Sequence, residues 1–529
     1  MHGSTEIRNS PRSPELFAGA AVAAVACVRL ALFLAATPDQ QIGLIPDDAF
    51  YYFIPARNFA QHGVWSFDGQ APTSGFHLLY GYSLAALFAV WPDISYPVLL
   101  ALVGSVSTAL LAAAAVLTAR AVSRDFAPTG VLGVVLVATL GLALAQQTLF
   151  VESCLVIFFA SALLALLSRG EASPLRLAAA FALGLAANLA RSDFGLLPAA
   201  CAVTTFALRG RAPRARAQLA LAAAALLGAA AGVACVALHT YAWSGSFVQG
   251  SARTKHRWSQ AIGYDVFGLI RLLVELVWFP HTKVLGVISA PALLVAAGLA
   301  AAAARARTGA ARLTEWPLLW GCAGCVVGYV LLYGESSAGV PQWYLANVLP
   351  ALAYLAGAGA SLFDRRALPA VIALVALSAL VNLRATLLPL WTHQVAMKAA
   401  GEYLHAHPEI TGVGAWNSGM IAWFAGRPVV NLDGLVNDEI EPYAKSGQLL
   451  EYLCRRKIDH LVDFAVMLEL GRLTRRNGLS DGRLRAQLIQ ELDFSQGRLE
   501  LRMKNTDLRL YRLAPGACAS LEGAGEVVE

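Results

Sequence analysis

Long apolar runs separated by short polar connections fill the first three quarters of the chain. A helix that crosses a membrane needs about 20 predominantly apolar residues, and eleven runs come close to this length. They cover approximately residues 16–36, 96–119, 129–145, 148–168, 175–190, 194–208, 218–241, 284–304, 316–334, 344–363 and 368–388. The pattern predicts a polytopic α-helical membrane protein with about eleven transmembrane helices.

Arginines recur in every second connection between these runs. They are Arg120, Arg124, Arg169, Arg176, Arg209, Arg211, Arg214, Arg216, Arg305, Arg307, Arg312, Arg365 and Arg366. Short cytoplasmic loops are enriched in Lys and Arg, so all these loops can be cytoplasmic together only if the shorter run Phe76–Trp91 does not cross. We therefore predict an interfacial or re-entrant helix there. Residues 37–95, 242–282 and 389–529 are then expected to lie outside.

From about residue 389 the apolar runs shorten and charges become frequent. Val413–Trp416, Val429–Leu432 and His460–Phe464 read as short buried strands, and Leu499–Met503 with Leu508–Leu513 reads as a hairpin. We therefore predict a transmembrane domain over residues 1–388 and a soluble extracytoplasmic α/β domain over residues 389–529. Its two cysteines, Cys454 and Cys518, could pair in an oxidising compartment.

The composition agrees with a membrane protein. Hydrophobic residues make up 57% of the chain and charged residues 14%, against about 25% charged in soluble domains, and the mean hydropathy is +0.57. The net charge of +6 comes largely from arginines in short loops and not from a nucleic-acid-binding tract. Cys322 and Cys325 form a CxxC inside an apolar run, where packing is favoured over zinc binding.

Arg29 lies inside the first apolar run. An arginine at the centre of a membrane helix costs about 2.5 to 3.5 kcal/mol on insertion scales. Two interpretations follow: Arg29 has a functional partner, or its long side chain reaches the outer membrane surface.

The polar, aromatic-rich stretch from Ile45 to His77 stands apart from the apolar runs and contains the adjacent acids Asp47 and Asp48. Pro46 and the spacing of Phe50 and Phe53 predict a short helix at the membrane surface. The two aspartates could cap that helix, or one of them could be a catalytic base at the boundary between water and lipid.

Other polar residues are predicted to converge on the same membrane face as Asp47 and Asp48. They are His77, Glu152, Asp193, Glu335, Trp343 and Tyr344, with Arg191 and Gln342 at the same helix ends. Glu152 and Asp193 each precede a predicted helix and could be simple caps. Carboxylates beside lipid are nevertheless rare without a function, so we treat the group as a candidate substrate-binding site.

The second predicted external loop carries Arg253, Lys255 and His256. Cations on the outside run against the usual distribution. They indicate an anionic partner, because Arg and Lys are the side chains that bind phosphate. A loop that only touches lipid head groups is the alternative.

These features resemble the membrane-embedded C-type (GT-C) glycosyltransferases, in particular bacterial members similar to protein O-mannosyltransferases, aminoarabinose transferases and arabinofuranosyltransferases. The resemblance rests on the layout of helices and loops and on five short tracts. They are Asp47-Asp48-Ala49-Phe50-Tyr51-Tyr52, Ala56-Arg57-Asn58, Pro72-Thr73-Ser74-Gly75-Phe76-His77, Gly414-Ala415-Trp416-Asn417-Ser418-Gly419 and Asn431-Leu432-Asp433-Gly434.

The resemblance implies an enzyme of the bacterial inner membrane that transfers a hexose or pentose, with inversion, from a polyprenyl-phosphate donor. The acceptor would be an extracytoplasmic glycan, lipid or protein, and Asp47 or Asp48 would be the general base. Some members of the superfamily use a divalent metal such as Mg or Mn, and the sequence leaves this open. It also leaves two alternatives, a transporter or flippase of lipid-linked sugars and a non-catalytic sugar receptor, although no internal repeat of the transporter kind is evident.

Overall fold

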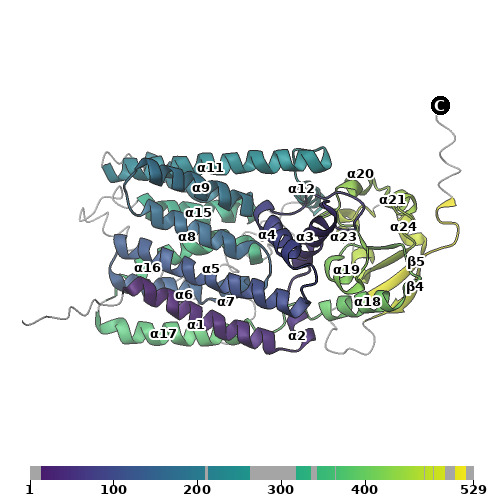
Figure 1. Cartoon of the computed structure of the whole chain (residues 1–529), viewed down its shortest axis with the longest axis horizontal. Coiled ribbons are helices and arrows are strands. Elements are labelled where there is room, and N and C mark those ends of the chain that lie inside the picture. Colours follow the sequence, from purple (N-terminus) through teal and green to yellow (C-terminus); the bar gives the residue numbers. More distant parts are fainter. Residues whose placement is uncertain are drawn as a thin grey trace, which may run out of the picture.

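The computed structural model describes residues 13–208, 213–262, 317–334, 342–363, 365–469, 471–479, 482–494 and 507–519. Long helices run side by side over most of its length and form a bundle, with a small sheet domain at one end (Figure 1). The bundle helices are α1 (Pro14–Ala35), α5 (Tyr96–Asp125), α6 (Val131–Ala138), α7 (Gly141–Ala145), α8 (Ser153–Leu167), α9 (Pro174–Ala190), α10 (Leu196–Ala207), α11 (Pro213–Ser244), α15 (Pro317–Gly334), α16 (Leu349–Ala360) and α17 (Leu368–Ala385).

The helices follow the apolar runs. Among the described residues, three are long and apolar enough to cross a membrane, Pro14–Ala35, Tyr96–Asp125 and Arg214–Ser244, and a fourth candidate is a pair of segments, Pro128–Ala138 and Gly141–Thr148, bent by 59°. Other predicted spans form shorter apolar helices, and residues 284–304 lie outside the described part. The helical membrane architecture is confirmed in this coarse form, whereas the number of eleven spans stays a prediction.

Arg29 is buried in the bundle, with 1% of its surface exposed. Its guanidinium donates to the Thr386 hydroxyl (2.9 Å), to Gln147 Oε1 (3.2 Å) and to the Thr148 hydroxyl (3.0 Å). Gln147 and Thr148 belong to the 3-10 turn η3 (Gln146–Thr148) that follows α7. Arg29 therefore does not reach the membrane surface; it joins α1 to the turn after the bent helix and to the end of α17.

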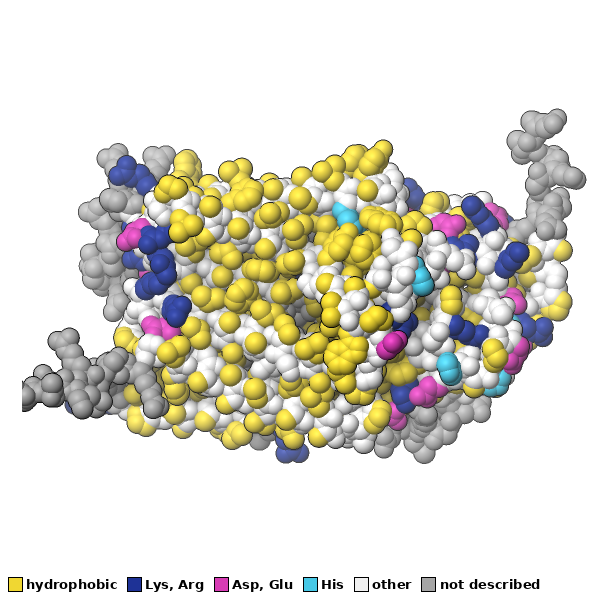
Figure 2. Space-filling view, in the orientation of Figure 1, with side chains coloured by type: hydrophobic (Ala, Val, Ile, Leu, Met, Phe, Trp, Pro, Cys, Tyr) yellow, Lys and Arg dark blue, Asp and Glu magenta, His cyan; other side chains and the backbone are white. Residues whose placement is uncertain are grey.

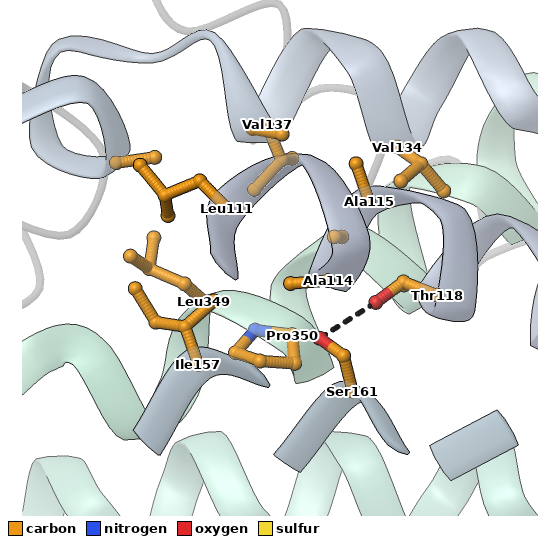
Figure 3. Close-up of a pocket in the computed structure, with 13 residues that line it drawn as sticks. Leu111, Ala114, Ala115, Thr118, Val134, Val137, Ile157, Ser161, Leu349 and Pro350 are labelled. Atoms are coloured by element: carbon orange, nitrogen blue, oxygen red, sulfur yellow. Dashed lines mark hydrogen bonds between the residues drawn. The ribbon is translucent and has the colours of Figure 1, made fainter. Parts of the chain in front are cut away.

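A small apolar pocket lies within the bundle between α5, α6, α8 and α16 (Figure 3). Its walls include Leu111, Val137 and Leu349, and the Thr118 hydroxyl donates to Ser161 at 3.0 Å beside it. The volume is about 30 Å³, which is room for only one or two water molecules. This pocket is too small to hold a sugar.

The described arginine-bearing connections meet at the end of the bundle opposite the sheet domain, where Figure 2 shows clustered Lys and Arg side chains. Arg124 in the last turn of α5 donates to the Ala165 carbonyl oxygen of α8 at 2.8 Å. Arg214 at the start of α11 pairs with Asp125 and donates to the Ser168 carbonyl oxygen. The described loops predicted to be cytoplasmic together thus lie together in space.

The predicted first external loop forms short helices between the bundle and the sheet domain (Figure 1). They are α2 (Pro38–Ile42), the 3-10 turn η1 (Asp47–Ala49), α3 (Phe50–His62) and α4 (Leu78–Val90). With 13 residues, α4 is about 20 Å long, short of the hydrocarbon core of about 30 Å. Its length and position agree with a surface helix, and the absence of a crossing stays a prediction.

The C-terminal part is a five-stranded mixed sheet of order β2-β1-β3-β5-β4. Its strands are β1 (Val413–Ala415), β2 (Val430–Asn431), β3 (His460–Phe464), β4 (Leu488–Asp493) and β5 (Leu508–Leu513). The helices around it are α18 (Gln394–Ala406), α19 (Gly419–Ala425), α20 (Glu441–Ser446), α21 (Leu449–Arg455), α22 (Ala465–Glu469), α23 (Gly471–Arg476) and α24 (Arg483–Ala486). The first three predicted strands are confirmed as β1, β2 and β3.

The predicted hairpin is different in the structure. β5 pairs antiparallel with β3 on one edge and with β4 on the other, so neither edge is open for a further strand. Residues 499–503, the predicted partner, lie outside the described residues. The sequence Leu-Ile-Gln-Glu-Leu-Asp of β4 lacks the strict alternation of a half-buried strand, and this explains why it was not predicted.

The first loop and the sheet domain share one hydrophobic core. Phe50 and Phe53 of α3 pack against Trp423 of α19, with ring centroids 5.8 and 5.9 Å apart, and one cluster of buried residues contains both regions. In the sheet domain, a disulfide joins Cys454 and Cys518, as the sequence allowed. The surface helices of the first loop are therefore held between the bundle and the sheet domain.

Candidate active site

Asp47 and Asp48 have different surroundings. Asp47 is buried, and its carboxylate accepts the backbone N–H groups of Gly419 (3.2 Å) and Met420 (2.6 Å) at the start of α19. Burial, with a smaller contribution from the neighbouring charge of Asp48, raises the pKa of Asp47 to about 7 in spite of these hydrogen bonds. Asp47 thus caps a helix of the C-terminal domain and not its own helix α3.

Asp48 keeps accessible surface, and among the described residues its carboxylate takes part in no hydrogen bond or ion pair. Burial among protein atoms raises its pKa; Lys255 and Arg476 lower it and Glu152 raises it through charge. A carboxylate with a raised pKa and a free oxygen is a competent proton acceptor near neutral pH. The structure therefore distinguishes the two aspartates, which the sequence could not.

Glu152 is the centre of a buried polar network. Its carboxylate accepts hydrogen bonds from the Tyr52 hydroxyl (2.7 Å) and from Arg191 (2.8 Å), and His77 Nε2 lies 3.6 Å away. Glu152 precedes α8, but its side chain makes no capping hydrogen bond. The capping interpretation of Glu152 is therefore wrong, and burial, as the largest cause, lowers the pKa of His77, so that this ring is neutral at pH 7.

Arg191 continues the network to Asp193. Its Nε donates to Asp193 Oδ1 at 2.9 Å, and Asn347 donates to the same oxygen at 2.8 Å. The cap of the following helix α10 is Gly195, so Asp193 does not cap a helix either. Asp193 and Glu152 hold the Arg191 guanidinium from two sides.

Two cations lie over the Tyr344 ring. The Arg191 guanidinium is 4.4 Å and the Lys255 ammonium 4.8 Å from the ring centroid. Lys255 is surrounded by protein yet keeps exposed surface, as expected for a side chain beside an open site. Its burial lowers the pKa, but Tyr344 and Asp48 raise it by more, so that the net shift is upward. Lys255 is therefore a cation held next to Asp48.

Two predicted residues are not part of this group. Arg253 lies 3.7 Å from Asp438 in an ion pair, and His256 is exposed and contacts Gln260 at 2.9 Å. Arg253 and His256, which were expected to contact a phosphate, therefore interact with other residues. The helix α12 (Gly250–Ile262) presents Lys255, but not Arg253 or His256, to Asp48. Glu335 lies outside the described residues. Trp343 contributes its backbone oxygen, which accepts from Arg191 at 3.4 Å.

Four residues outside the predicted set of site residues lie in this region, although Arg191 was predicted to lie on the same membrane face. Arg191 and Tyr52 hold Glu152, and Arg476 and Asp433 of the C-terminal domain interact electrostatically with Asp48. The position of Arg191 at a predicted helix end and the Asn431-Leu432-Asp433-Gly434 tract were signals for two of them. Nothing in the local sequence around Arg476 connects it to residues more than 400 positions earlier.

The described residues do not define a divalent metal site on their own. No cluster of three or more His, Cys, Asp or Glu side chains able to hold a metal ion occurs among them. Glu152, the carboxylate best placed to assist Asp48, is already occupied by Arg191 and Tyr52. The possible Mg or Mn ion therefore has no defined ligand set among the described residues, and its involvement stays a prediction.

A second, polar cleft of about 720 Å³ lies between α3, the segment before α5 and the C-terminal domain, with Arg57, Gln61, Asp93 and Arg427 in its walls. The Arg57 guanidinium lies 4.6 Å above the Trp423 ring. Ligand pockets commonly have volumes of about 300 to 1,000 Å³. The cleft is large enough for a sugar-sized group.

Comparisons with known proteins agree with this architecture. A family described as "Domain of unknown function (DUF8728)" matches residues 385–511, which is the C-terminal domain. A comparison with curated protein sequences gives no match.

Similar solved structures cover nearly the whole chain. The apo oligosaccharyltransferase of Archaeoglobus fulgidus has a TM-score of 0.57 and 13% identity, over 88% of this chain and 72% of that one. ArnT from Cupriavidus metallidurans bound to undecaprenyl phosphate has a TM-score of 0.57 and 12% identity, over 94% of this chain and 98% of that one. The archaeal oligosaccharyltransferase AglB from Archaeoglobus fulgidus, in complex with an inhibitory peptide and a dolichol-phosphate, has a TM-score of 0.51 and 13% identity, over 92% of this chain and 76% of that one.

Identities this low establish the fold alone. The predicted resemblance is confirmed at that level, and the apolar helices together with this fold indicate an integral membrane protein. The chain has the fold of the membrane-embedded GT-C glycosyltransferases, of which ArnT and AglB are examples.

Proposed function

We propose that the protein is a glycosyltransferase that moves a sugar from a polyprenyl-phosphate donor to an extracytoplasmic glycan, lipid or protein acceptor, with inversion. The observation that carries the proposal is Asp48, an accessible carboxylate without a hydrogen bond to any described residue, next to the cation Lys255. A base and a phosphate-binding cation are the two groups that such a transfer requires.

The donor class is supported by the relatives of this fold. The ArnT structure contains undecaprenyl phosphate and an AglB structure contains a dolichol-phosphate. The apolar helices beside the site can accommodate a prenyl chain, and Lys255 can contact the phosphate as a point charge.

In the proposed step, an acceptor hydroxyl oxygen attacks the anomeric carbon and forms the new glycosidic bond. Asp48 accepts the hydroxyl proton while the bond between the anomeric carbon and the phosphate oxygen breaks. The electron pair stays on that oxygen, so that the lipid phosphate leaves with one additional negative charge, which Lys255 stabilises. Attack from the face opposite the leaving group inverts the anomeric carbon.

The Glu152 network holds the other side of the proposed site. With both oxygens engaged by Tyr52 and Arg191, Glu152 positions Arg191 under the Tyr344 ring that also supports Lys255. His77 and Asp193 complete this group and are proposed to contact the sugar. An ordered set of donors and acceptors fixes a substrate orientation before reaction.

We propose that the site faces the extracytoplasmic side. The described arginine-bearing loops lie at the opposite end of the bundle, where the enrichment of Arg in cytoplasmic loops would place them inside. A disulfide in the C-terminal domain is typical of an oxidising compartment. An inner-membrane protein of a bacterium with its C-terminal domain outside fits both observations.

The test is transfer by the purified protein from undecaprenyl-phosphoryl hexoses and pentoses to a lipid and glycan extract of cell envelopes. Mass spectrometry should detect a glycosylated product and free undecaprenyl phosphate in equal amounts. Transfer from a nucleotide sugar without lipid would contradict the proposal. Movement of the intact lipid-linked sugar across liposomes without bond cleavage would favour the flippase alternative.

A further inference from the structure

The C-terminal domain is held directly against the proposed site. Asp47, the residue before the proposed base, caps α19 of that domain. On the other side, Thr254 of α12 donates to the Gly434 carbonyl oxygen at 2.9 Å, and Arg257 lies 3.2 Å from Glu441. Both loops that carry the proposed catalytic groups therefore dock on the same domain.

Arg476, at the end of α23, is the cation that this domain brings to the site. Its guanidinium lies 3.5 Å from the centroid of the Trp258 ring, and its backbone oxygen accepts a hydrogen bond from Arg257. Among the described residues the Arg476 side chain makes no ion pair and no hydrogen bond, and its buried Nε atom has no partner. Stacking on Trp258 fixes the orientation of the guanidinium plane, while its N–H groups donate no hydrogen bond to a described residue.

The surrounding charges show which ligand would satisfy those donors. Asp433 and Asp48 interact with Arg476 electrostatically but form no ion pair with it, and Arg257 adds a like charge. Arg257 is itself satisfied by Glu441 and by the Asp433 carbonyl oxygen. Of the two arginines, only Arg476 has a side chain with no ion pair and no hydrogen bond among the described residues, and a half-buried guanidinium without such a partner is costly.

Lys255 of α12, like Arg476, has no carboxylate of the described residues in ion-pair contact. It lies over the Tyr344 ring and forms no ion pair among the described residues, while its charge interacts with Asp48. Two cations from distant parts of the chain therefore lie near the proposed base without carboxylates of their own. A phosphate is the ligand that such a pair favours, because a guanidinium can bind it through two N–H groups and an ammonium as a point charge.

We infer that Arg476 binds the phosphate of the lipid-linked donor together with Lys255, so that the C-terminal domain completes the active site. This inference rests on the proposed function for the identity of the phosphate. In the transfer step the bond to the anomeric carbon breaks, its electron pair goes to the phosphate oxygen, and the acceptor proton goes to Asp48. Arg476 binds the phosphate before and after this step, without itself gaining or losing a proton.

The test compares Arg476→Gln, Arg476→Lys and the control Arg485→Gln, which removes an exposed arginine of α24. Binding of undecaprenyl phosphate is measured by native mass spectrometry of the full-length protein in detergent, and donor and acceptor KM are measured in the transfer assay. We expect Arg476→Gln to weaken lipid-phosphate binding and raise donor KM by about 10- to 100-fold, the loss typical of one charged contact. Acceptor KM should stay unchanged, Arg476→Lys should recover part of the loss, and Arg485→Gln should match the wild type.

The outcomes separate this inference from the proposed function. Wild-type transfer with unchanged donor KM in a folded Arg476→Gln variant would overturn the inference and leave the function intact. Phosphate binding that depends on Arg476, in a protein that transfers no sugar, would support the inference and contradict the function. If Arg476→Gln has no thermal unfolding transition and is therefore not folded, the Arg476→Lys variant is the test. An equal loss of donor and acceptor affinity in Arg476→Lys would identify a structural role only and overturn the inference.

Discussion

Neutralising Lys255 and Glu152 should move the pH dependence of transfer in opposite directions. Asp48 must be ionised to accept a proton, so activity falls as the pH falls through its pKa, which burial raises above the ordinary value. Lys255 lowers this pKa and Glu152 raises it. In Lys255→Gln the acid limb of the pH–activity profile, where activity falls with falling pH, should therefore move to higher pH. In Glu152→Gln the same limb should move to lower pH.

The expected size follows from Coulomb's law. Neither charge is within ion-pair distance of Asp48 among the described contacts. At a separation of about 7 Å and an effective dielectric constant of about 20, two charges interact by about 2.4 kcal/mol. One pKa unit corresponds to about 1.4 kcal/mol, so each limb should move by roughly one to two pH units.

The assay is kcat/KM for the lipid-linked donor measured between about pH 4 and pH 9, because this ratio reports the ionisation of the free enzyme. The exposed-site variant Arg485→Gln provides the matched control and should keep the wild-type midpoint. Shifts of the same sign in both variants, or a midpoint that neither variant moves, would refute Asp48 as the titrating base.

Three further predictions concern groups that the structure separates. Asp47→Ala removes the cap of α19 and should cost about 0.5 to 2 kcal/mol of stability, seen as faster hydrogen exchange at Gly419 and Met420; unchanged exchange would contradict the capping role. Arg253→Gln should leave donor KM within about twofold, since Arg253 pairs with Asp438, whereas Lys255→Gln should raise it by about tenfold or more; equal effects would contradict the assignment of Lys255. Arg57→Ala, in the polar cleft, should raise acceptor KM and spare donor KM if the acceptor enters there, and a selective donor effect would exclude that route.

Much of the architecture could be predicted from local patterns. Apolar runs give helices, short β-branched runs give β1, β2 and β3, and the alternation of arginine loops anticipates their convergence at one end of the bundle. The helix count and the partner of β5 could not be predicted in the same way. Bent or short helices such as α6 with α7 break the length rule, and β4 lacks the alternation that marks a strand.

Only the part of the site that lies outside the C-terminal domain could be predicted from the sequence. His77, Glu152, Asp193, Lys255 and Tyr344 come together as expected, because the first three and Tyr344 were predicted at the same ends of apolar helices and Lys255 in a loop on the same side of the membrane. The roles of Asp47 and Asp48 could not be separated, since the difference is made by α19, which lies about 370 residues later in the sequence. Arg253 and Lys255 are two positions apart on one helix, and the structure directs them to different partners.

The most direct test of the account is single-turnover transfer from an undecaprenyl-phosphoryl sugar by the wild type, Asp48→Asn and Asp47→Asn. Asparagine keeps the size of the side chain but cannot accept the proton. The account predicts a fall of about 100-fold or more for Asp48→Asn, with lipid-phosphate binding retained, and a much smaller fall for Asp47→Asn. Near-wild-type turnover in Asp48→Asn would contradict the account.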